Sequence, residues 1–232
     1  MTDDWAPGER APAMLRSGIR LRQGAPAEAQ GHSSPQEAPA VSGLALRTFC
    51  RSLTRLRGAE CLREVLARLP APLAEALGVG GLQPEAWCPI AWLIDLHQTA
   101  QRVTGSDLRL SRELGYEGTR DNLRGSHRFY VTNGDTSVVL RRAPQIFSLF
   151  FRGAGLLQVT PLGPSRGGAA TGHAIARWTD TVAFTDSLWQ EQLGSCEAAL
   201  ELSGARVQSL SFTTGGRSGS PITELEARWS TR

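Results

Sequence analysis

The chain has 232 residues, of which 41% are apolar and 20% are charged, and its formal net charge at pH 7 is +3. A chain of this length forms a substantial hydrophobic core without disulfides or structural metals. So small a net charge argues against a nucleic-acid partner, because nucleic-acid binding needs a concentrated basic surface. All 25 basic side chains are arginine, a bias that is typical of a GC-rich coding sequence.

Cysteine spacing and hydropathy indicate the cellular compartment. Cys50, Cys61, Cys88 and Cys196 stand apart, without the CxxC spacing of metal and redox sites, so we expect reduced thiols. The N-terminus lacks the basic start and apolar run of a signal peptide, and no stretch has the roughly 18 uncharged apolar residues of a membrane span. The sequence therefore predicts a cytoplasmic protein without a membrane partner.

The first 42 residues differ in composition from the rest. They are rich in Pro, Gly, Ser, Ala and Gln and show almost no aliphatic periodicity. Such a segment buries too little apolar surface to offset the entropy lost on ordering. We therefore expect a disordered N-terminal tail over 1–42, with or without a docking role, followed by a single α+β domain over 43–232.

The domain is predicted to open with three helices. Apolar residues recur at intervals of three and four over 44–56, and this helix should close near Gly58. Shorter helices follow over 59–69 and 72–77. A row of arginines on another face of the first helix either is solvated or holds an anion: Arg47, Arg51 and Arg55.

The stretch 87–103 is predicted to be a helix that is apolar on nearly every face, with Pro89 inside its first turn. A helix of this kind is covered on more than one side and acts as the centre of a domain. It carries His97 among its apolar residues. His97 is either a ligand-binding or acid-base group, or a core residue that hydrogen-bonds to the protein.

A second arginine cluster follows. A helix is expected near 108–114, and in the segment 118–128 Arg120, Arg124 and Arg128 recur at intervals of four. If that segment is helical, its arginines form one basic line that could bind an anionic ligand. Nearby carboxylates could instead pair with the same arginines at three and four residues: Glu113, Glu117 and Asp121.

An aromatic helix is predicted over 137–152, where Pro144 should kink it or mark its real start. Phe147 and Phe151 belong to its apolar face. An aromatic helix of this kind either walls a ligand cavity or packs in the core. Phe147 and Phe151 are therefore candidate ligand contacts, together with His97, Arg120 and Arg124.

The period of the apolar pattern then changes from about 3.6 to 2. Alternation over 157–160 and 174–178 predicts an antiparallel hairpin. A helix over 185–203 starts at a threonine cap and stops before a glycine. Two more strands are expected over 207–213 and 222–229. The fold class is therefore α+β, with an N-terminal helical layer followed by a β-β-α-β-β antiparallel sheet unit.

This order of parts resembles a family of uncharacterised myxobacterial proteins over residues 43–229. The stretches that carry the resemblance are GLALRTF at 43–49, RGAE at 57–60, WCPIAW at 87–92, RELG at 112–115, RDNLR at 120–124, and the helix 189–204 that leads to Trp229. The C-terminal helix on a Gly-interrupted hairpin also looks like the ligand-binding domains of the four-vinyl-reductase and haem-nitric-oxide-sensor type. That second resemblance implies a small-ligand domain in bacterial signalling. The cysteine and histidine placements on which metal or haem binding would rest are absent, so it carries over no ligand residue.

Three functions remain open from the sequence, and no motif specifies a reaction. The first is a non-enzymatic small-ligand-binding or sensory module, whose ligand would be small and either apolar or anionic. The second is an interaction protein that docks a protein partner, and a homodimer is also left open. The third is an enzyme with a serine, a histidine and a carboxylate at its centre: Ser126 or Ser195, with His97, His127 or His173, and with Asp95, Asp121 or Asp186.

Overall fold

The computed structural model describes residues 38–78, 81–125, 127–131, 135–163, 171–181 and 183–231. The chain divides into residues 1–35 and 36–232, and everything described belongs to the second unit. The predicted disordered tail thus lies mostly outside the described residues and stays a prediction there. Its last residues are ordered, because Ala40–Ser42 form strand β1.

Helix α1 spans Gly43–Leu66 and is kinked. Its two halves correspond to the predicted helices 44–56 and 59–69, which are continuous in the structure. Ser42 caps it, with the main-chain N–H of Ala45 donating to Oγ at 3.3 Å. The kink is at Gly58, whose φ of 88° breaks the helical geometry. A short helix, α2, follows over Ala71–Leu77.

The predicted helix 87–103 begins later than expected. Trp87–Pro89 form strand β2, and helix α3 covers Ile90–Thr104. Pro89 is extended, with ψ of 134°, and residues before a proline also favour extended backbone, which explains the strand. The apolar character of the helix is confirmed, since Leu93, Leu96 and His97 have no exposed surface.

Helix α4 spans Leu108–Arg124 and starts at Asp107, whose side chain accepts from the N–H of Arg109. Arg128–Tyr130 form a short 3-10 turn, η1. Arg128 therefore does not continue the basic line of α4. Helix α5 covers Thr136–Phe150 and contains Pro144, in agreement with the predicted aromatic helix to within two residues.

Two antiparallel sheets organise the strands. A small sheet has the order β2-β1-β3, in which β3 is Phe151–Arg152 directly after α5. The larger sheet has the order β4-β5-β7-β6 and is antiparallel throughout. Its strands are Leu156–Pro161 (β4), Thr171–Thr179 (β5), Ala205–Thr214 (β6) and Ile222–Thr231 (β7). The small sheet was not predicted, because each of its strands has only two or three residues.

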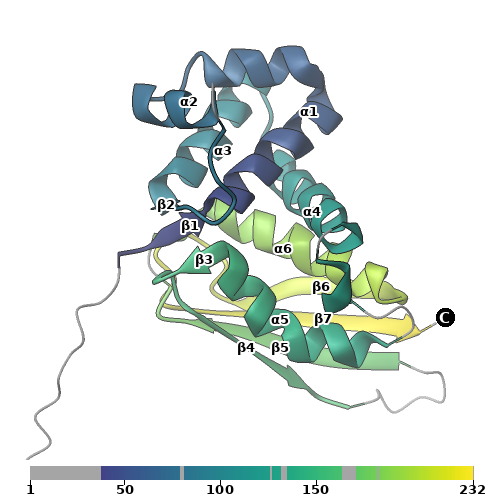
Figure 1. The fold of residues 1–232 in the computed structure, drawn as a ribbon. Coiled ribbons are helices and arrows are strands. Elements are labelled where there is room, and N and C mark those ends of the chain that lie inside the picture. The colour runs from purple at the N-terminus through teal and green to yellow at the C-terminus, as the bar shows by residue number, and fades with distance from the viewer. Residues whose placement is uncertain are drawn as a thin grey trace, which may run out of the picture. The chain divides into compact units, whose positions relative to one another are not determined.

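Helix α6, Asp186–Leu202, starts at the predicted cap Thr185 and lies between β5 and β6 in sequence. Figure 1 shows α5 and α6 along the same face of the larger sheet, with the helical layer of α1 to α4 beyond them. The predicted β-β-α-β-β unit and the α+β fold class are thus confirmed. Among the described residues, no helix is long and apolar enough to cross a bilayer.

One hydrophobic core joins the helical layer to the sheet. It includes Leu53 from α1, Leu93 from α3 and Trp189 from α6. The ring of Trp189 meets the ring of Trp178 from β5 edge-on, with centroids 5.8 Å apart. Bulky buried side chains from both layers therefore share the same apolar volume, which ties the helices to the sheet.

Helices α4 and α6 approach so closely that their main chains touch. A Cβ atom on Gly115 would lie 2.1 Å from the carbonyl oxygen of Glu191. A Cβ atom on Gly194 would lie 2.0 Å from the carbonyl oxygen of Arg112. Only glycine fits at these two positions, which fixes how the two helices face each other beside the cavity described next.

Candidate functional site

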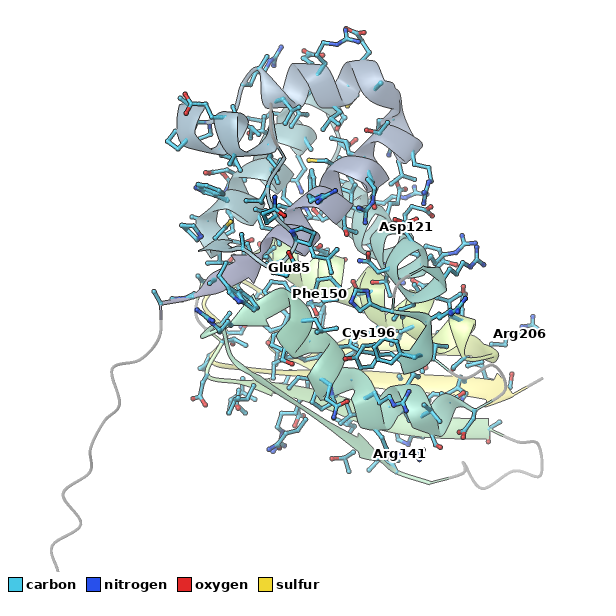
Figure 2. The ribbon with its side chains drawn as sticks, in the orientation of Figure 1. Glu85, Asp121, Arg141, Phe150, Cys196 and Arg206 are labelled. Atoms are coloured by element: carbon cyan, nitrogen blue, oxygen red, sulfur yellow. The ribbon has the colours of Figure 1, made fainter. Side chains whose placement is uncertain are left out.

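A cavity of about 120 Å³ lies between α1, α4, α5 and α6 and extends to β4 and β5. Its wall is mainly apolar and aromatic, with contributions from Phe49, Phe147, Phe150, Phe151, Leu157 and Trp178. Phe150 from α5 and Cys196 from α6 are labelled in Figure 2 and belong to the same wall. The predicted aromatic helix therefore does line a cavity.

Small residues account for the space. Each of the four helices presents at least one of them to the cavity: Ala45 from α1, Gly118 from α4, Ala143 from α5 and Ala199 from α6. The aromatic side of the wall is held by ring contacts, with Phe147 and Phe151 5.0 Å apart and Phe151 and Phe184 5.3 Å apart between centroids. Aromatic rings at these separations attract each other, so these contacts hold the rings of Phe147 and Phe151 in place in the wall.

The polar groups in the wall are few. Thr48 and Asn122 bond to each other, with Nδ2 of Asn122 donating to Oγ1 of Thr48 at 3.2 Å. Ser195 donates its hydroxyl to the carbonyl oxygen of Gly115 at 3.3 Å. The indole N–H of Trp178 is buried and has no acceptor among the described residues. Trp178 therefore has an unused hydrogen-bond donor that is fully buried.

Cys196 lies at the α6 side of the cavity. Burial raises the pKa of its thiol to about 12, so the group is neutral at physiological pH. The residue nevertheless keeps some accessible surface. A partly accessible side chain with a strongly desolvated thiol fits a residue that faces an internal cavity and not bulk water.

His97 lies behind this wall, in a buried polar network. Its Nε2 is 3.0 Å from Oε2 of Glu191, and its Nδ1 is 3.0 Å from Oγ of Ser111. The amide of Gln101 donates to the same serine oxygen at 3.0 Å. Because that oxygen already accepts, the serine hydroxyl is free to donate to Nδ1, and His97 then donates from Nε2 to the carboxylate.

The His97 network has the residue types of a hydrolase triad, but its serine is enclosed. Ser111 has no exposed surface, so no substrate carbonyl reaches its oxygen in this structure. His97 does not line the cavity, whereas Glu191 does. The network therefore fixes the position of Glu191 in the wall, and His97 is a buried residue bonded to the protein, one of the two alternatives that the sequence left open.

The candidate ligand residues fall into two groups. Phe147 and Phe151 line the cavity. The guanidinium of Arg120 lies 5.5 Å from the ring centre of Tyr116 and 3.8 Å from the carboxylate of Glu117. Arg124 is exposed at the end of α4. Neither arginine is part of the wall, and neither is any residue of α3.

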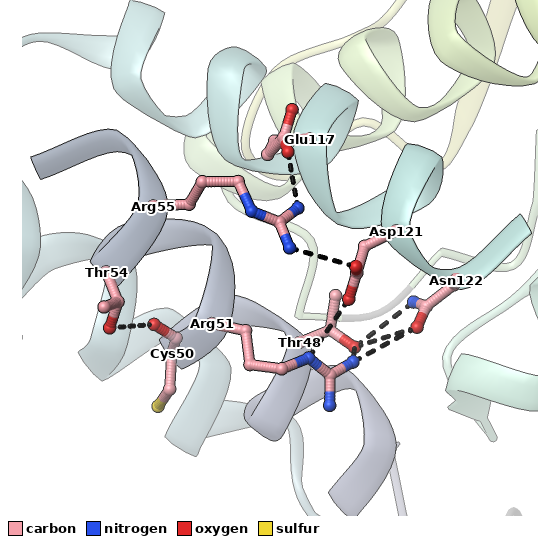
Figure 3. A network of polar contacts seen from close by, with 8 residues as sticks. All are labelled: Thr48, Cys50, Arg51, Thr54, Arg55, Glu117, Asp121 and Asn122. Carbon is pink, nitrogen blue, oxygen red and sulfur yellow. Dashed lines mark hydrogen bonds and ion pairs between the residues drawn. The ribbon is translucent and has the colours of Figure 1, made fainter. Parts of the chain in front are cut away.

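Two arginines of the row on α1, Arg51 and Arg55, hold α4, as Figure 3 shows. Arg47 instead donates to the carbonyl oxygen of Leu82 at 3.4 Å. Arg51 pairs with Asp121 at 3.1 Å, and Arg55 pairs with Glu117 at 2.5 Å and with Asp121 at 3.1 Å. These carboxylates were expected to pair within their own helix. Glu117 does so with Arg120 at 3.8 Å, but Glu117 and Asp121 also pair with α1. Arg51 and Arg55 are therefore already bound to carboxylates.

The serine-histidine combinations expected for an enzyme are not assembled among the described residues. Ser195 bonds to a main-chain carbonyl, and His173 pairs with Glu226 at 2.7 Å on the sheet. Ser126 lies outside the described residues. The structure does combine His97 with Ser111 and Glu191. The sequence did not predict this combination, because Glu191 is 94 positions from His97 and a local sequence pattern does not indicate so distant a contact.

No protein-family model matches the sequence, and no curated protein matches it. Solved structures do match: an oxygen-binding H-NOX domain related to soluble guanylate cyclases is 13% identical, with a TM-score of 0.58 over 82% of this chain and 94% of that chain. The unliganded Fe(II) form of an H-NOX mutant from K. algicida is 10% identical, with a TM-score of 0.58 over 82% and 97%. A mutant of T. Tengcongensis H-NOX is 15% identical, with a TM-score of 0.54 over 82% and 96%.

This chain has an H-NOX-like fold. The predicted likeness to domains of the haem-nitric-oxide-sensor type is thereby confirmed for the fold. The likeness to the myxobacterial family and to four-vinyl-reductase domains stays a prediction.

An H-NOX-like fold raises the question of haem, and the cavity does not fit one. Sites for cofactors and drug-sized ligands have volumes of about 300–1,000 Å³, whereas this cavity has about 120 Å³. Haem iron is held by His, Cys thiolate, Met or Tyr. The wall contains no His, Met or Tyr, and its cysteine, Cys196, is a neutral thiol. No group of three metal-ligating side chains occurs among the described residues.

Proposed function

We propose that this domain is a small-ligand-binding sensory module whose ligand occupies the cavity between the helical layer and the sheet. The observation that carries the proposal is the aromatic cavity itself, which is lined by four helices and by one residue each of β3, β4 and β5. Phe147 and Phe151 would contact the ligand. Concave, mostly apolar pockets with a few polar groups are the usual form of small-molecule sites, and the H-NOX-like fold supports the same class of function.

The size and charge of the cavity favour one of the two expected ligand types. A cavity of about 120 Å³ is close to an engineered cavity of about 150 Å³ that binds benzene or xenon in another protein. No arginine belongs to the wall, and the charged residue that does is Glu191. An anion would meet a carboxylate there. The proposed ligand is therefore uncharged, apolar and about the size of a single ring.

The position of the cavity gives a route from binding to signalling. A ligand would touch α1 and α4 on one side and α5, β4 and β5 on the other. Its binding free energy would then depend on how these elements are spaced. A ligand that binds one spacing more tightly shifts the population towards it, which is what a sensor requires.

The test measures thermal unfolding with toluene as the probe ligand. At a toluene concentration of about 100 Kd, binding adds about 2.7 kcal/mol to the free energy of unfolding. In a domain of this size that amounts to a rise in Tm of about 5–10 °C. Ala199→Leu places a larger side chain in the cavity and should abolish the rise. Ala59→Leu, at an exposed position of α1, should leave it unchanged.

The competing adaptor hypothesis predicts a different result. If the domain only docks a protein partner, toluene leaves the Tm of all three proteins unchanged. A rise that persists in Ala199→Leu would place the ligand elsewhere and would also count against this cavity.

A further inference from the structure

We propose that the side-chain amide of Gln192 binds the ligand through hydrogen bonds and that the ligand carries a hydroxyl group. This inference rests on the proposed function, because it names the chemistry of the molecule that fills the same cavity. The ligand class is then an uncharged molecule of single-ring size with one hydroxyl, such as a phenol or a cyclic alcohol.

Gln192 of α6 lines the cavity, and only 8% of its surface is exposed. In the described part of the chain, its side-chain amide has no hydrogen-bond partner. Buried amides normally have partners, because an unpartnered one is unfavourable. Gln101 of α3 follows that rule, since its amide donates to Oγ of Ser111 at 3.0 Å and to Oγ of Ser187 at 3.2 Å.

The amide of Gln192 is accessible from the cavity. Among the described residues, two side-chain polar atoms are both unpartnered and fully covered, and they belong to Ser52 and Trp178. The unpartnered amide atoms of Gln192 are not among them, so they keep accessible surface.

The neighbours of Gln192 on α6 show where this surface lies. Leu188 and Trp189, one turn before it, have no exposed surface. Ser195 and Cys196, one turn after it, line the cavity as Gln192 does. The accessible part of the amide therefore faces the cavity.

The polar groups around this part of the wall favour a hydroxyl. A glutamine amide offers donors and an acceptor, whichever way its oxygen and nitrogen are assigned. Glu191 adds an acceptor to the wall, because only one of its two carboxylate oxygens is bonded to His97. A hydroxyl both donates and accepts, so it matches both kinds of group. A ligand carboxylate only accepts, and it would be buried in the same cavity as a second negative charge.

The experiment measures the affinity of the full chain for three probes of similar size: toluene, phenol and benzaldehyde. A single hydrogen bond of ordinary net strength corresponds to about a fivefold change in affinity. After correction for transfer from water, benzaldehyde, which only accepts, should bind about fivefold more tightly than toluene. Phenol, which donates and accepts, should bind about 25-fold more tightly than toluene.

Two variants test whether Gln192 makes the difference. Gln192→Met keeps the length of the side chain and removes the amide, so the preference for phenol over toluene should disappear. Gln190→Met is the matched control, because Gln190 lies on the same helix and does not line the cavity. It should keep the full preference.

The stability of Gln192→Met without any probe is a second readout. Because this variant removes a buried polar group that has no partner in the protein, its Tm should be at least that of the wild type. A clear fall in Tm would mean that the protein itself bonds the amide, and it would overturn the proposal.

Nuclear magnetic resonance of the wild-type chain gives a readout that does not depend on the folding of a variant. Phenol should move the side-chain amide proton signals of Gln192 downfield as the bond forms, and toluene should not. The corresponding signals of Gln101, whose amide is already bonded, serve as the internal reference.

The outcomes separate the two proposals. Equal binding of toluene and phenol, with no downfield shift at Gln192, overturns the role of the amide while the ligand cavity stands. Tighter binding of benzaldehyde than of phenol overturns the hydroxyl. A failure of all three probes to bind would remove the ligand cavity and this inference together.

Discussion

The contact between α4 and α6 leads to a prediction in which two physical effects have opposite signs. Gly194→Ala should destabilise the domain, although alanine is the better helix former by about 1 kcal/mol. The added Cβ would lie 2.0 Å from the carbonyl oxygen of Arg112, which belongs to the main chain and cannot rotate away. The helices would have to separate, and overpacking of this kind costs about 1–3 kcal/mol.

The structure places Gly194→Ala at the upper end of that range, because the obstacle is rigid main chain. Subtracting the gain in helix propensity leaves a net loss of about 2 kcal/mol in the free energy of unfolding. For a domain of this size we expect a fall in Tm of about 4–8 °C. Gly115→Ala should behave in the same way, since its Cβ would lie 2.1 Å from the carbonyl oxygen of Glu191.

Thermal unfolding followed by circular dichroism measures the effect, and Gly118→Ala is the matched control on α4. Its Cβ would meet a side chain, Cγ2 of Thr48, at 2.8 Å, and a side chain can shift. Gly118→Ala should therefore change the Tm much less than Gly194→Ala. The close approach would be refuted if Gly194→Ala raised the Tm, as helix propensity alone requires.

Four further predictions concern charge, thiol chemistry, haem and the buried network. The hydrogen bond from Arg228, and then that from His173, lower the pKa of the Glu226 carboxyl below its ordinary value of 4.5. The stability that results is present above pH 4.5 and is lost as the pH falls through the lowered pKa, so the difference in Tm between wild type and Glu226→Gln should shrink in acid. A difference in Tm that does not depend on pH would contradict this. Because burial raises the thiol pKa of Cys196 to about 12, iodoacetamide should label Cys196 in the native protein far more slowly than in denaturant, as peptide mass spectrometry can check. Protein purified from haem-supplemented cells should show no Soret band, and a stoichiometric band would refute the description of the cavity wall. Ser111→Ala removes a buried partner of His97 and should cost about 1–3 kcal/mol in chemical denaturation, whereas a neutral effect would mean that the bond contributes nothing.

The elements that could be predicted are those with strong local signals. Helix α6 has a threonine cap, an apolar stripe and a terminal glycine, and its bounds agree with the prediction to within a residue. The strands of the larger sheet have period-2 alternation and turn signals. Trp87–Pro89 was taken into a helix because its apolar residues continue the pattern of α3, whereas the extended backbone at Pro89 ends it.

The site was less accessible to sequence reasoning, because it is assembled from distant segments. Phe147 and Phe151 were found through the aromatic content of one helix. Glu191 reaches His97 across 94 positions, and the missing acceptor of Trp178 is a property of its neighbours and not of its spacing. The arginine row of α1 suggested an anion site since the carboxylate partners of Arg51 and Arg55 sit on another helix, as Arg55 and Glu117 do.

The small sheet links one residue of the cavity wall to strands β1 and β2. Phe151 is both a residue of the cavity wall and a residue of β3, where it is paired with Val41 of β1. Val41 is also paired with Cys88, just before α3 begins. Val41 thus pairs with both Phe151, at the end of α5, and Cys88, before the start of α3. A displacement of Phe151 would therefore act on β1, which leads into α1, and through β1 on β2. If the proposed ligand binds, the smallest sheet of the domain is thus where its effect on Phe151 would reach β1 and β2.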